Sequence, residues 1–282
     1  MTDDSANLDL AASRNRELIL EIRDKIAFIT INRPEARNAI SSPIIHEILE
    51  FLDQVKSDDG VGTVLLQATG KSFIAGGDLK LFAAGLEMSP EDRAQDMKTR
   101  AARAGRLCAA LATLPQPVVV AARGTTVGVG VSILCAADLA IVSDASQFRL
   151  SHVQLGLSPD GAATYYLPRQ IGLKRANALA LLGDAVSARE ALAMGLVNWV
   201  VPDADLEEQA ESLAQRLAAA PATAVAEIKA LFRSSFNRDL EAQIAAEAES
   251  LHRCAVTADY AEGLRAILEK RPARFGERSA AS

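Results

Sequence analysis

The segment 151–161, SHVQLGLSPDG, holds two side chains that could move protons, His152 and Asp160. Its other residues are largely apolar, and an imidazole or a carboxylate in such surroundings can serve as a general base. The same residues also fit a plain turn, in which the aspartate caps the backbone and the histidine packs against its neighbours. This segment alone leaves both interpretations open.

Two glycine-containing segments indicate a second kind of chemistry, the binding of a negatively charged oxygen by backbone amides. The first, KSFIAGGDLK, has Gly76 and Gly77 after a strand-like run, and glycine lets the backbone approach a ligand closely. The second, GTTVGVGVSILCAAD, has Gly128 and Gly130 before an apolar helical run, whose N-terminal amides would favour an anion. Neither has the ending of a phosphate loop or a complete dinucleotide fingerprint. Each is a weak signal alone, and the pair in this order is a stronger one.

The composition argues against several classes of function. A chain of 282 residues, 49% of them hydrophobic, can form one main domain with a sizeable core and an appendage. Its 36 acidic residues against 30 Lys and Arg give a net charge of −6. This balance disfavours a broad nucleic-acid or anionic-membrane surface. We therefore expect no nucleic-acid partner and no membrane association, and local basic residues must meet any anionic ligand.

Cysteine usage and the N-terminal segment predict a cytoplasmic protein. The three cysteines, Cys108, Cys135 and Cys254, are odd in number and far apart, unlike a disulfide framework or a metal site. No metal is therefore expected. Residues 1–16 are acidic, with neither a basic start nor an apolar run long enough for export or for spanning a membrane. They predict a disordered lead.

The elements that must position the loops alternate between strands and helices. A hairpin is predicted over 18–32, followed by an amphipathic helix with Ser42 as its N-cap. Continuous apolar runs at 62–70, 116–124 and 138–146 are typical of strands buried on both faces of a parallel sheet. The predicted fold class is α/β, built from repeated β-β-α units.

Further helices are predicted between and after these strands. One runs from Ser89 to about Leu114, and another begins at a capping box formed by Ser187 and Glu190. The tail over 202–275 has amphipathic helical periodicity, and no low-complexity linker separates it from the rest.

Six segments form a recognisable pattern by their residues, their order along the chain and the spacing between them. They are NRPEARNAI, FIAGGDLK, GTTVGVGVSILCAADLAIVSDASQFRL, LGLSPDGAATYYLPRQIG, SAREALAMGLVNWVVP and ADYAEGLRAILEKRPARF. Through them the chain resembles the crotonase family, the enoyl-CoA hydratases and isomerases, most of all isomerase-like members similar to 1,2-epoxyphenylacetyl-CoA isomerase. The resemblance implies a spiral of β-β-α units over 17–200 that carries an acyl-CoA site. It also implies a C-terminal helical region over 201–282 that forms a homotrimer or a dimer of trimers.

The resemblance further implies how the loops would act on an acyl-CoA thioester. The backbone N–H groups of Gly77 and Val129 would form an oxyanion hole, although the family usually has glycine or alanine at the second position. Ser132 and His152 replace the two glutamates that activate water in the hydratases, so efficient hydration is not expected. Asp160 matches an aspartate of the isomerase-like members and would shuttle a proton. His152 would either take part in the chemistry or only shape the acyl pocket.

Coenzyme A would enter as part of the substrate, and no separate cofactor is expected. Arg33 and Arg37 are candidates for its phosphates, or else ordinary surface charges, and Lys270 would reach the ligand of a neighbouring subunit. Asp78 would organise its loop rather than act as a catalyst. The segments that would bind coenzyme A contain Ala36, Ala75, Gly77, Asp78, Leu79 and Lys80.

Three functions are compatible with these residues. An isomerase that uses Asp160 is favoured. One alternative is a hydratase of low or altered activity, which the missing glutamate pair argues against. The other is a non-catalytic member that binds acyl-CoA or a partner, which the intact Asp160 argues against. The residues do not identify the acyl group.

Overall fold

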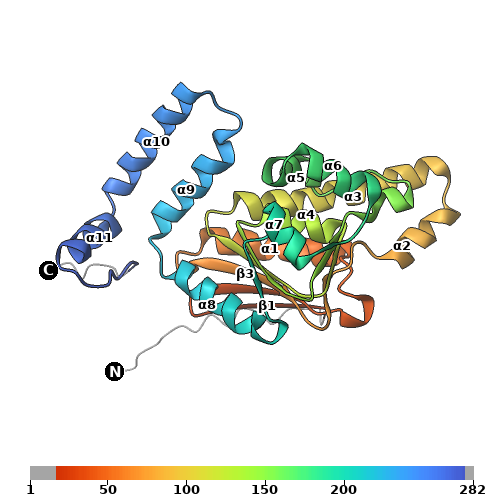
Figure 1. The fold of residues 1–282 in the computed structure, drawn as a ribbon, viewed down its shortest axis with the longest axis horizontal. Coiled ribbons are helices and arrows are strands. Elements are labelled where there is room, and N and C mark those ends of the chain that lie inside the picture. The colour runs from red at the N-terminus through yellow and green to blue at the C-terminus, as the bar shows by residue number, and fades with distance from the viewer. Residues whose placement is uncertain (1–16, 277–282) are drawn as a thin grey trace.

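The computed structural model describes residues 17–276, and the predicted lead at 1–16 lies outside them (Figure 1). The described chain forms two β-sheets with helices packed around them and a helical C-terminal part. Two strands and a helix recur in successive turns, which confirms the α/β spiral of β-β-α units. Within this part, no helix combines the length and the apolar character needed to cross a membrane.

The larger sheet has six strands in the order β1-β2-β3-β5-β7-β10. These strands are β1 (Leu18–Arg23), β2 (Ile26–Ile31), β3 (Thr63–Ala68), β5 (Val118–Ala122), β7 (Leu139–Ser143) and β10 (Trp199–Val201). β1 and β2 pair antiparallel as the predicted hairpin, while the other neighbours pair parallel. Asp24 and Lys25 make the hairpin turn with φ of 51° and 62°, the positive values that a two-residue turn of this kind requires.

Alternate side chains of this sheet enter two different cores. Ile26 and Phe28 of β2 pack with α8 (Leu206–Ala218), whereas Ala27 and Ile29 belong to the larger core. This division follows from the two-residue period of a strand, and it explains why the strands read as continuous apolar runs. The helices of the larger core are α1 (Ser42–Ser57), α3 (Pro90–Thr113), α4 (Val129–Ala136), α5 (Ala163–Ile171), α6 (Leu173–Leu182) and α7 (Ala188–Met194).

A smaller sheet brings the candidate loops together. Its strands, in the order β4-β6-β8-β9, are β4 (Ser72–Ile74), β6 (Thr125–Val127), β8 (Gln147–Arg149) and β9 (Val186–Ser187). β4, β6 and β8 are parallel neighbours. The carboxyl ends of parallel strands meet at one edge of a sheet. The Gly76 loop, the Gly128 loop and the His152 segment therefore start side by side.

The predicted helix boundaries hold with one correction. α3 begins at Pro90, and α7 carries the predicted capping box of Ser187 and Glu190. The N-cap of α1 was predicted at Ser42, which is wrong, because Ser42 is the first helical residue and Ser41 stands at the cap position. The Ser42 hydroxyl instead accepts a hydrogen bond of 2.9 Å from Arg103 of α3.

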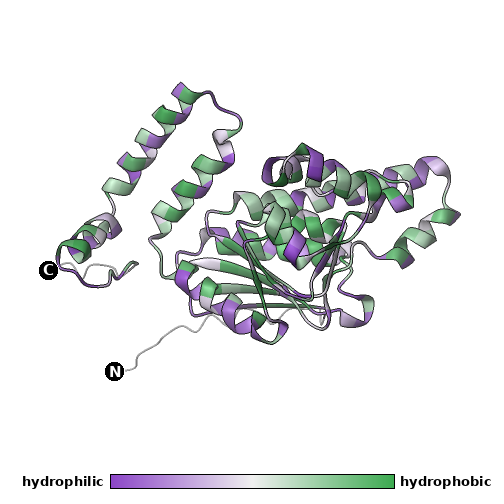
Figure 2. Ribbon diagram, viewed as in Figure 1, coloured by the Kyte–Doolittle hydropathy of each residue, from purple (hydrophilic) through white to green (hydrophobic). Residues whose placement is uncertain are grey.

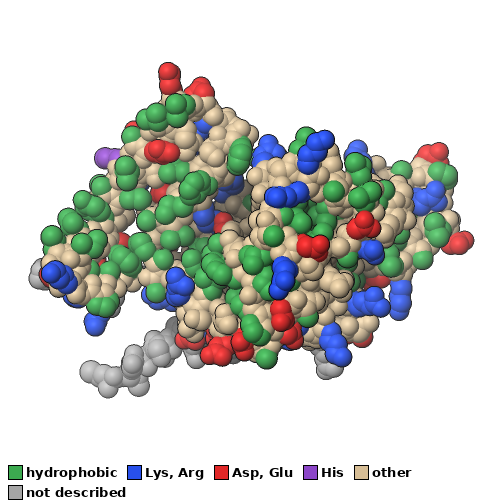
Figure 3. Space-filling model, in the orientation of Figure 1, with side chains coloured by type: hydrophobic (Ala, Val, Ile, Leu, Met, Phe, Trp, Pro, Cys, Tyr) green, Lys and Arg blue, Asp and Glu red, His purple; other side chains and the backbone are tan. Residues whose placement is uncertain are grey.

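The last three helices extend away from the sheets (Figure 1). They are α9 (Ala222–Ser235), α10 (Leu240–Ala255) and α11 (Ala258–Leu268). Lys229 anchors α9 to the body by an ion pair with Asp138 and a hydrogen bond of 2.6 Å to the carbonyl of Gln116. Beyond this anchor the three helices alternate apolar and polar residues and expose many apolar side chains (Figures 2 and 3).

Candidate functional site

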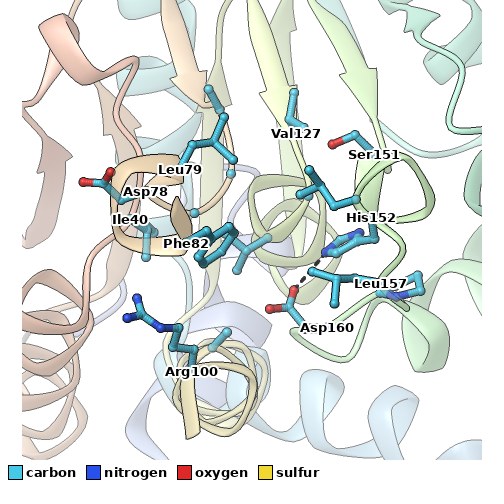
Figure 4. A pocket seen from close by; sticks show the side chains of 18 of the residues that line it. Ile40, Asp78, Leu79, Phe82, Arg100, Val127, Ser151, His152, Leu157 and Asp160 are labelled. Atoms are coloured by element: carbon cyan, nitrogen blue, oxygen red, sulfur yellow. Dashed lines mark hydrogen bonds and ion pairs between the residues drawn. The ribbon is translucent and has the colours of Figure 1, made fainter. Parts of the chain in front are cut away.

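A cavity of about 720 Å³ opens where the three loops of the smaller sheet meet α3 (Figure 4). Its lining combines the loop after β4, the N-terminus of α4 after β6, and the segment 151–160 after β8. Apolar side chains such as Ile40, Phe82 and Leu157 make up much of the wall. A largely apolar cleft with a few convergent polar groups is the usual form of a small-molecule site.

Two glycines shape the N-terminus of α4. Gly128 has φ of 56° and ψ of −119°, a conformation that other residues rarely adopt. At Gly130, a Cβ atom would lie 2.6 Å from the carbonyl oxygen of Ile74, so only glycine lets α4 approach β4 this closely. Among the described residues, the N–H group of Val129 has no hydrogen-bond partner, as expected for the first turn of a helix. This amide is free to meet an oxyanion.

The loop after β4 presents a second free amide. Gly76 has φ of 99°, and its carbonyl accepts a hydrogen bond of 3.0 Å from the N–H of Ile40. The N–H of Gly77 has no partner within the described chain. A Cβ at Gly77 would lie 2.6 Å from Cζ of Phe82, so a larger residue here would have to displace the Phe82 ring. Both amides predicted for the oxyanion hole therefore belong to residues that line one cavity.

Asp78 holds this loop in place. Its Oδ1 accepts a hydrogen bond of 3.0 Å from the N–H of Lys80 and so caps α2 (Leu79–Ala84), while Oδ2 lies 3.4 Å from a terminal nitrogen of Arg33. Arg33 in turn donates to the carbonyl of Ala39 at 2.8 Å. These contacts give Asp78 and Arg33 structural partners and support the loop-organising role expected for Asp78.

His152 and Asp160 lie against each other in the cavity (Figure 4). Nε2 of His152 is 3.3 Å from Oδ1 of Asp160, and the two side chains are 13% and 29% exposed. An ionised carboxylate can only accept a hydrogen bond, so Nε2 must carry the proton. Nδ1 of His152 is buried and has no partner among the described atoms. The pair therefore points one carboxylate oxygen at an imidazole and leaves the other available to the cavity.

The groups behind Asp160 are neutral. The Ser132 hydroxyl donates a hydrogen bond of 2.9 Å to the carbonyl of Asp160, which fixes the backbone of the loop to α4. Burial and the charge of Asp160 raise the pKa of the Cys108 thiol to about 12, and burial raises that of Cys135 as well. Within 17–276, no cluster of histidine, cysteine and acidic residues could hold a metal ion.

The structure brings most of the predicted site residues to this cavity. The lining includes Arg37, Ala75, Gly77, Asp78, Leu79, Val129, His152 and Asp160. Ala36 and Lys80 flank residues of the lining but are not part of it, and Lys270 follows α11, in the C-terminal part. Their binding roles stay predictions.

Sequence reasoning missed the wall that α2 and α3 contribute. Phe82 lines the cavity from α2, and Met97, Arg100 and Ala104 line it from α3. A signal was present, because residues 97, 100, 101 and 104 fall on one face of a helix. Periodicity shows that these side chains share a face, but not that the face meets a cavity.

The family model described as enoyl-CoA hydratase/isomerase matches residues 21–278. The chain belongs to this family. It is 34% identical to an Escherichia coli protein named 1,2-epoxyphenylacetyl-CoA isomerase, over 92% of this chain and 98% of that one. It is also 34% identical to a Rhodobacter capsulatus protein named "Probable enoyl-CoA hydratase", over 90% of this chain and 96% of that one.

Solved structures lead to the same family. The fold matches that of an enoyl-CoA hydratase from Bacillus anthracis with a TM-score of 0.86 and 30% identity, over 93% of this chain and all of that chain. Membership of the enoyl-CoA hydratase/isomerase family makes this protein an acyl-CoA enzyme. The names of its relatives include both reaction types, so they do not choose between hydration and isomerisation.

Proposed function

We propose that this enzyme isomerises enoyl-CoA thioesters through an enolate, with Asp160 as the proton shuttle. The observation that carries the proposal is which contacts the carboxylates in the cavity wall already make. Within the described chain, Asp78 and Asp160 are the acidic residues of the lining. Asp78 is engaged by Arg33 and by the backbone of α2, whereas Asp160 contacts a single imidazole through one oxygen. Asp160 is therefore the available base.

A 3-enoyl thioester would react in two proton transfers. The amides of Gly77 and Val129 donate to the thioester oxygen, and Asp160 takes a proton from carbon 2. The electron pair of that C–H bond becomes the enolate. Asp160 then returns the proton to carbon 4, so that the double bond moves from carbons 3 and 4 to carbons 2 and 3. Removing one oxyanion donor typically costs about a hundredfold to a thousandfold in rate, so the two amides supply much of the stabilisation.

Hydration is the second candidate function, because hydratases are among the relatives and His152 can exchange a proton. Isomerisation is favoured over hydration for one reason. Adding water requires a base to activate the water and an acid to protonate the substrate. Ser132 cannot replace a carboxylate, and its hydroxyl is committed to the carbonyl of Asp160.

A non-catalytic binding protein would not need a carboxylate beside the two free amides.

Coenzyme A would lie along the loop after β4. Ala75, Asp78 and Leu79 line the cavity after β4, and Arg37 lines it from the segment between β2 and α1. These residues are proposed to contact the ligand, with Ala36 and Lys80 beside them. Lys270 is proposed to reach a neighbouring subunit's ligand in a homotrimer or a dimer of trimers. Coenzyme A is part of the substrate in this proposal, and no other cofactor takes part.

The Asp160→Asn variant tests the proposal directly, since it keeps the shape of the side chain and removes the basic oxygen. We expect isomerisation of a 3-enoyl-CoA to fall about a hundredfold or more in kcat, while calorimetry shows that the thioester still binds. We expect the wild-type enzyme to hydrate crotonyl-CoA slowly. Rapid hydration that is abolished by His152→Ala and spared by Asp160→Asn would show that the isomerase assignment is wrong.

A further inference from the structure

A guanidinium group lies in the cavity wall and takes no part in the proton transfer. Arg100 projects from α3 among the lining residues, and its side chain is 25% exposed. Its Nε donates a hydrogen bond of 2.6 Å to Asp96, one turn earlier on the same helix. Its central carbon lies 5.8 Å from the centroid of the Phe82 ring. The guanidinium is thus held from two sides.

The contact with Asp96 occupies one of the five N–H donors of Arg100. Within 17–276, its two terminal nitrogens have no hydrogen-bond acceptor. Arg33 differs, because its terminal nitrogens reach the carbonyl of Ala39 and the carboxylate of Asp78. The terminal N–H groups of Arg100 are therefore the donors that remain for a ligand, while Asp96 neutralises the charge through Nε. A planar pair of terminal N–H groups is also the arrangement that binds a carboxylate with two parallel hydrogen bonds.

The surroundings of Arg100 indicate which part of a ligand would meet it. Its neighbours on α3 in the same wall offer no acceptor: Met97, Ala101 and Ala104 are apolar, and the Lys98 ammonium group only donates. Figure 4 shows the guanidinium directed toward Ile40 and Phe82, with Asp160 on the other side of the cavity. A plain hydrocarbon chain could fill this end of the cavity but would offer the terminal nitrogens no acceptor.

We propose that Arg100 is an anion subsite for the end of the acyl group, and that the preferred substrates are CoA thioesters whose chain ends in a carboxylate. The inference rests on the proposed function, because it assumes a thioester held by the two free amides. It deepens that function by naming the substrate class. Asp96 fixes the guanidinium plane through Nε, and the terminal nitrogens receive the carboxylate.

The test compares two 3-enoyl-CoA thioesters of equal carbon number, one ending in a carboxylate and one in a methyl group. The variants are Arg100→Leu, which removes the donors, and Arg100→Lys, which keeps the charge without the planar pair. Arg106→Leu is the matched control, since Arg106 is exposed on α3 and does not line the cavity. Isomerisation and ligand binding by calorimetry are measured for each protein.

We expect the wild type to favour the carboxylate-ended thioester in kcat/KM. Arg100→Leu should lower kcat/KM for that substrate by about tenfold to a hundredfold, the loss of hydrogen bonds to a charged group, and leave the methyl-ended substrate unchanged or improved. Arg100→Lys should retain part of the preference. Arg106→Leu should leave kcat/KM unchanged for both thioesters.

Three results would overturn the subsite. The first is a wild-type preference for the methyl-ended thioester, and the second is an equal loss of kcat/KM for both thioesters in Arg100→Leu. The third is a loss of calorimetric affinity for free coenzyme A in Arg100→Leu as large as the loss for the carboxylate-ended thioester. The last would mean that Arg100 meets the phosphates of coenzyme A. If the wild type isomerises neither thioester, the proposed function fails separately. Calorimetric affinities for saturated acyl-CoA ending in a carboxylate or a methyl group then still decide the role of Arg100.

Discussion

At the scale of single residues, the contact between His152 and Asp160 determines how the proposed base is presented. The imidazole donates from Nε2 to one carboxylate oxygen, and this hydrogen bond orients the other oxygen toward the cavity. Gly128 lies against the ring, since a Cβ there would be in van der Waals contact with Cε1 of His152 at 3.6 Å. If Asp160 is the base, as proposed, we expect His152 to act on the reaction through Asp160 rather than by touching the substrate.

Two substitutions of His152 separate the hydrogen bond from the volume of the ring. His152→Gln can still donate from a position close to that of Nε2, whereas His152→Phe keeps a ring and loses the donor. We expect the Phe variant to lower kcat by about tenfold, the effect of one lost hydrogen bond, and the Gln variant to stay within a few-fold of the wild type. KM should change little in both. Equal losses in the two variants, or a loss as large as that of Asp160→Asn, would argue for direct catalysis by the imidazole.

At the scale of elements, the two amides proposed for the oxyanion hole come from different β-β-α turns, so their spacing depends on how closely α4 packs on β4. Gly130 sets this distance, because its missing side chain lets α4 lie against the carbonyl of Ile74. Ile74 ends β4, and the chain continues through Ala75 into Gly76 and Gly77. A displacement of α4 at Gly130 would therefore separate Val129 from the loop that carries Gly77.

Gly130→Ala tests this coupling. The added Cβ must push α4 and β4 apart, which should cost about 1–3 kcal/mol of stability. Because both amides are shifted and neither is removed, kcat/KM should fall by about tenfold to a hundredfold. Gly105→Ala on α3 is the control, since nothing lies within 4 Å of its added Cβ. Removing a helical glycine there should stabilise the protein by about 0.5–1 kcal/mol and leave the rate unchanged. Thermal unfolding and steady-state kinetics measure both effects.

The elements also show what the sequence could predict. β3 was predictable because it is a continuous apolar run buried on both faces, and α7 because Ser187 and Glu190 form a capping box. β4, β6 and β8 were not, because each has only three residues and no measurable periodicity. The types of the loop residues and the family resemblance indicated residues that line the cavity, and their roles stay predictions. Arg100 was missed because a helical pattern does not show which face meets a cavity.

At the scale of the whole molecule, α8 and the three helices after it have different environments. α8 buries Leu206, Ala210 and Ala214 against the larger sheet. α9, α10 and α11 bury little. Phe232 of α9 is 73% exposed, Ile267 of α11 is 76% exposed, and Val256, which directly follows α10, is 76% exposed. Exposed apolar side chains on this scale are typical of a surface that contacts another molecule. Lys229 of α9, paired with Asp138, attaches these helices to the sheet-containing part of the protein. This contact fixes the orientation of α9 and of its exposed apolar face.

We expect these faces to be covered by copies of the same chain, because α9, α10 and α11 have no sheet of their own to pack on. Light scattering at micromolar concentration should give the mass of a trimer or a hexamer. Replacing two exposed apolar residues with charge, as in Phe232→Asp with Val256→Asp, should shift the protein toward smaller species, since unpaired carboxylates would be buried in the interface. Arg106→Leu, on exposed α3 surface, should leave the mass unchanged. A monomer for the wild type would contradict the expectation, and an unchanged mass in the double variant would place the interface elsewhere.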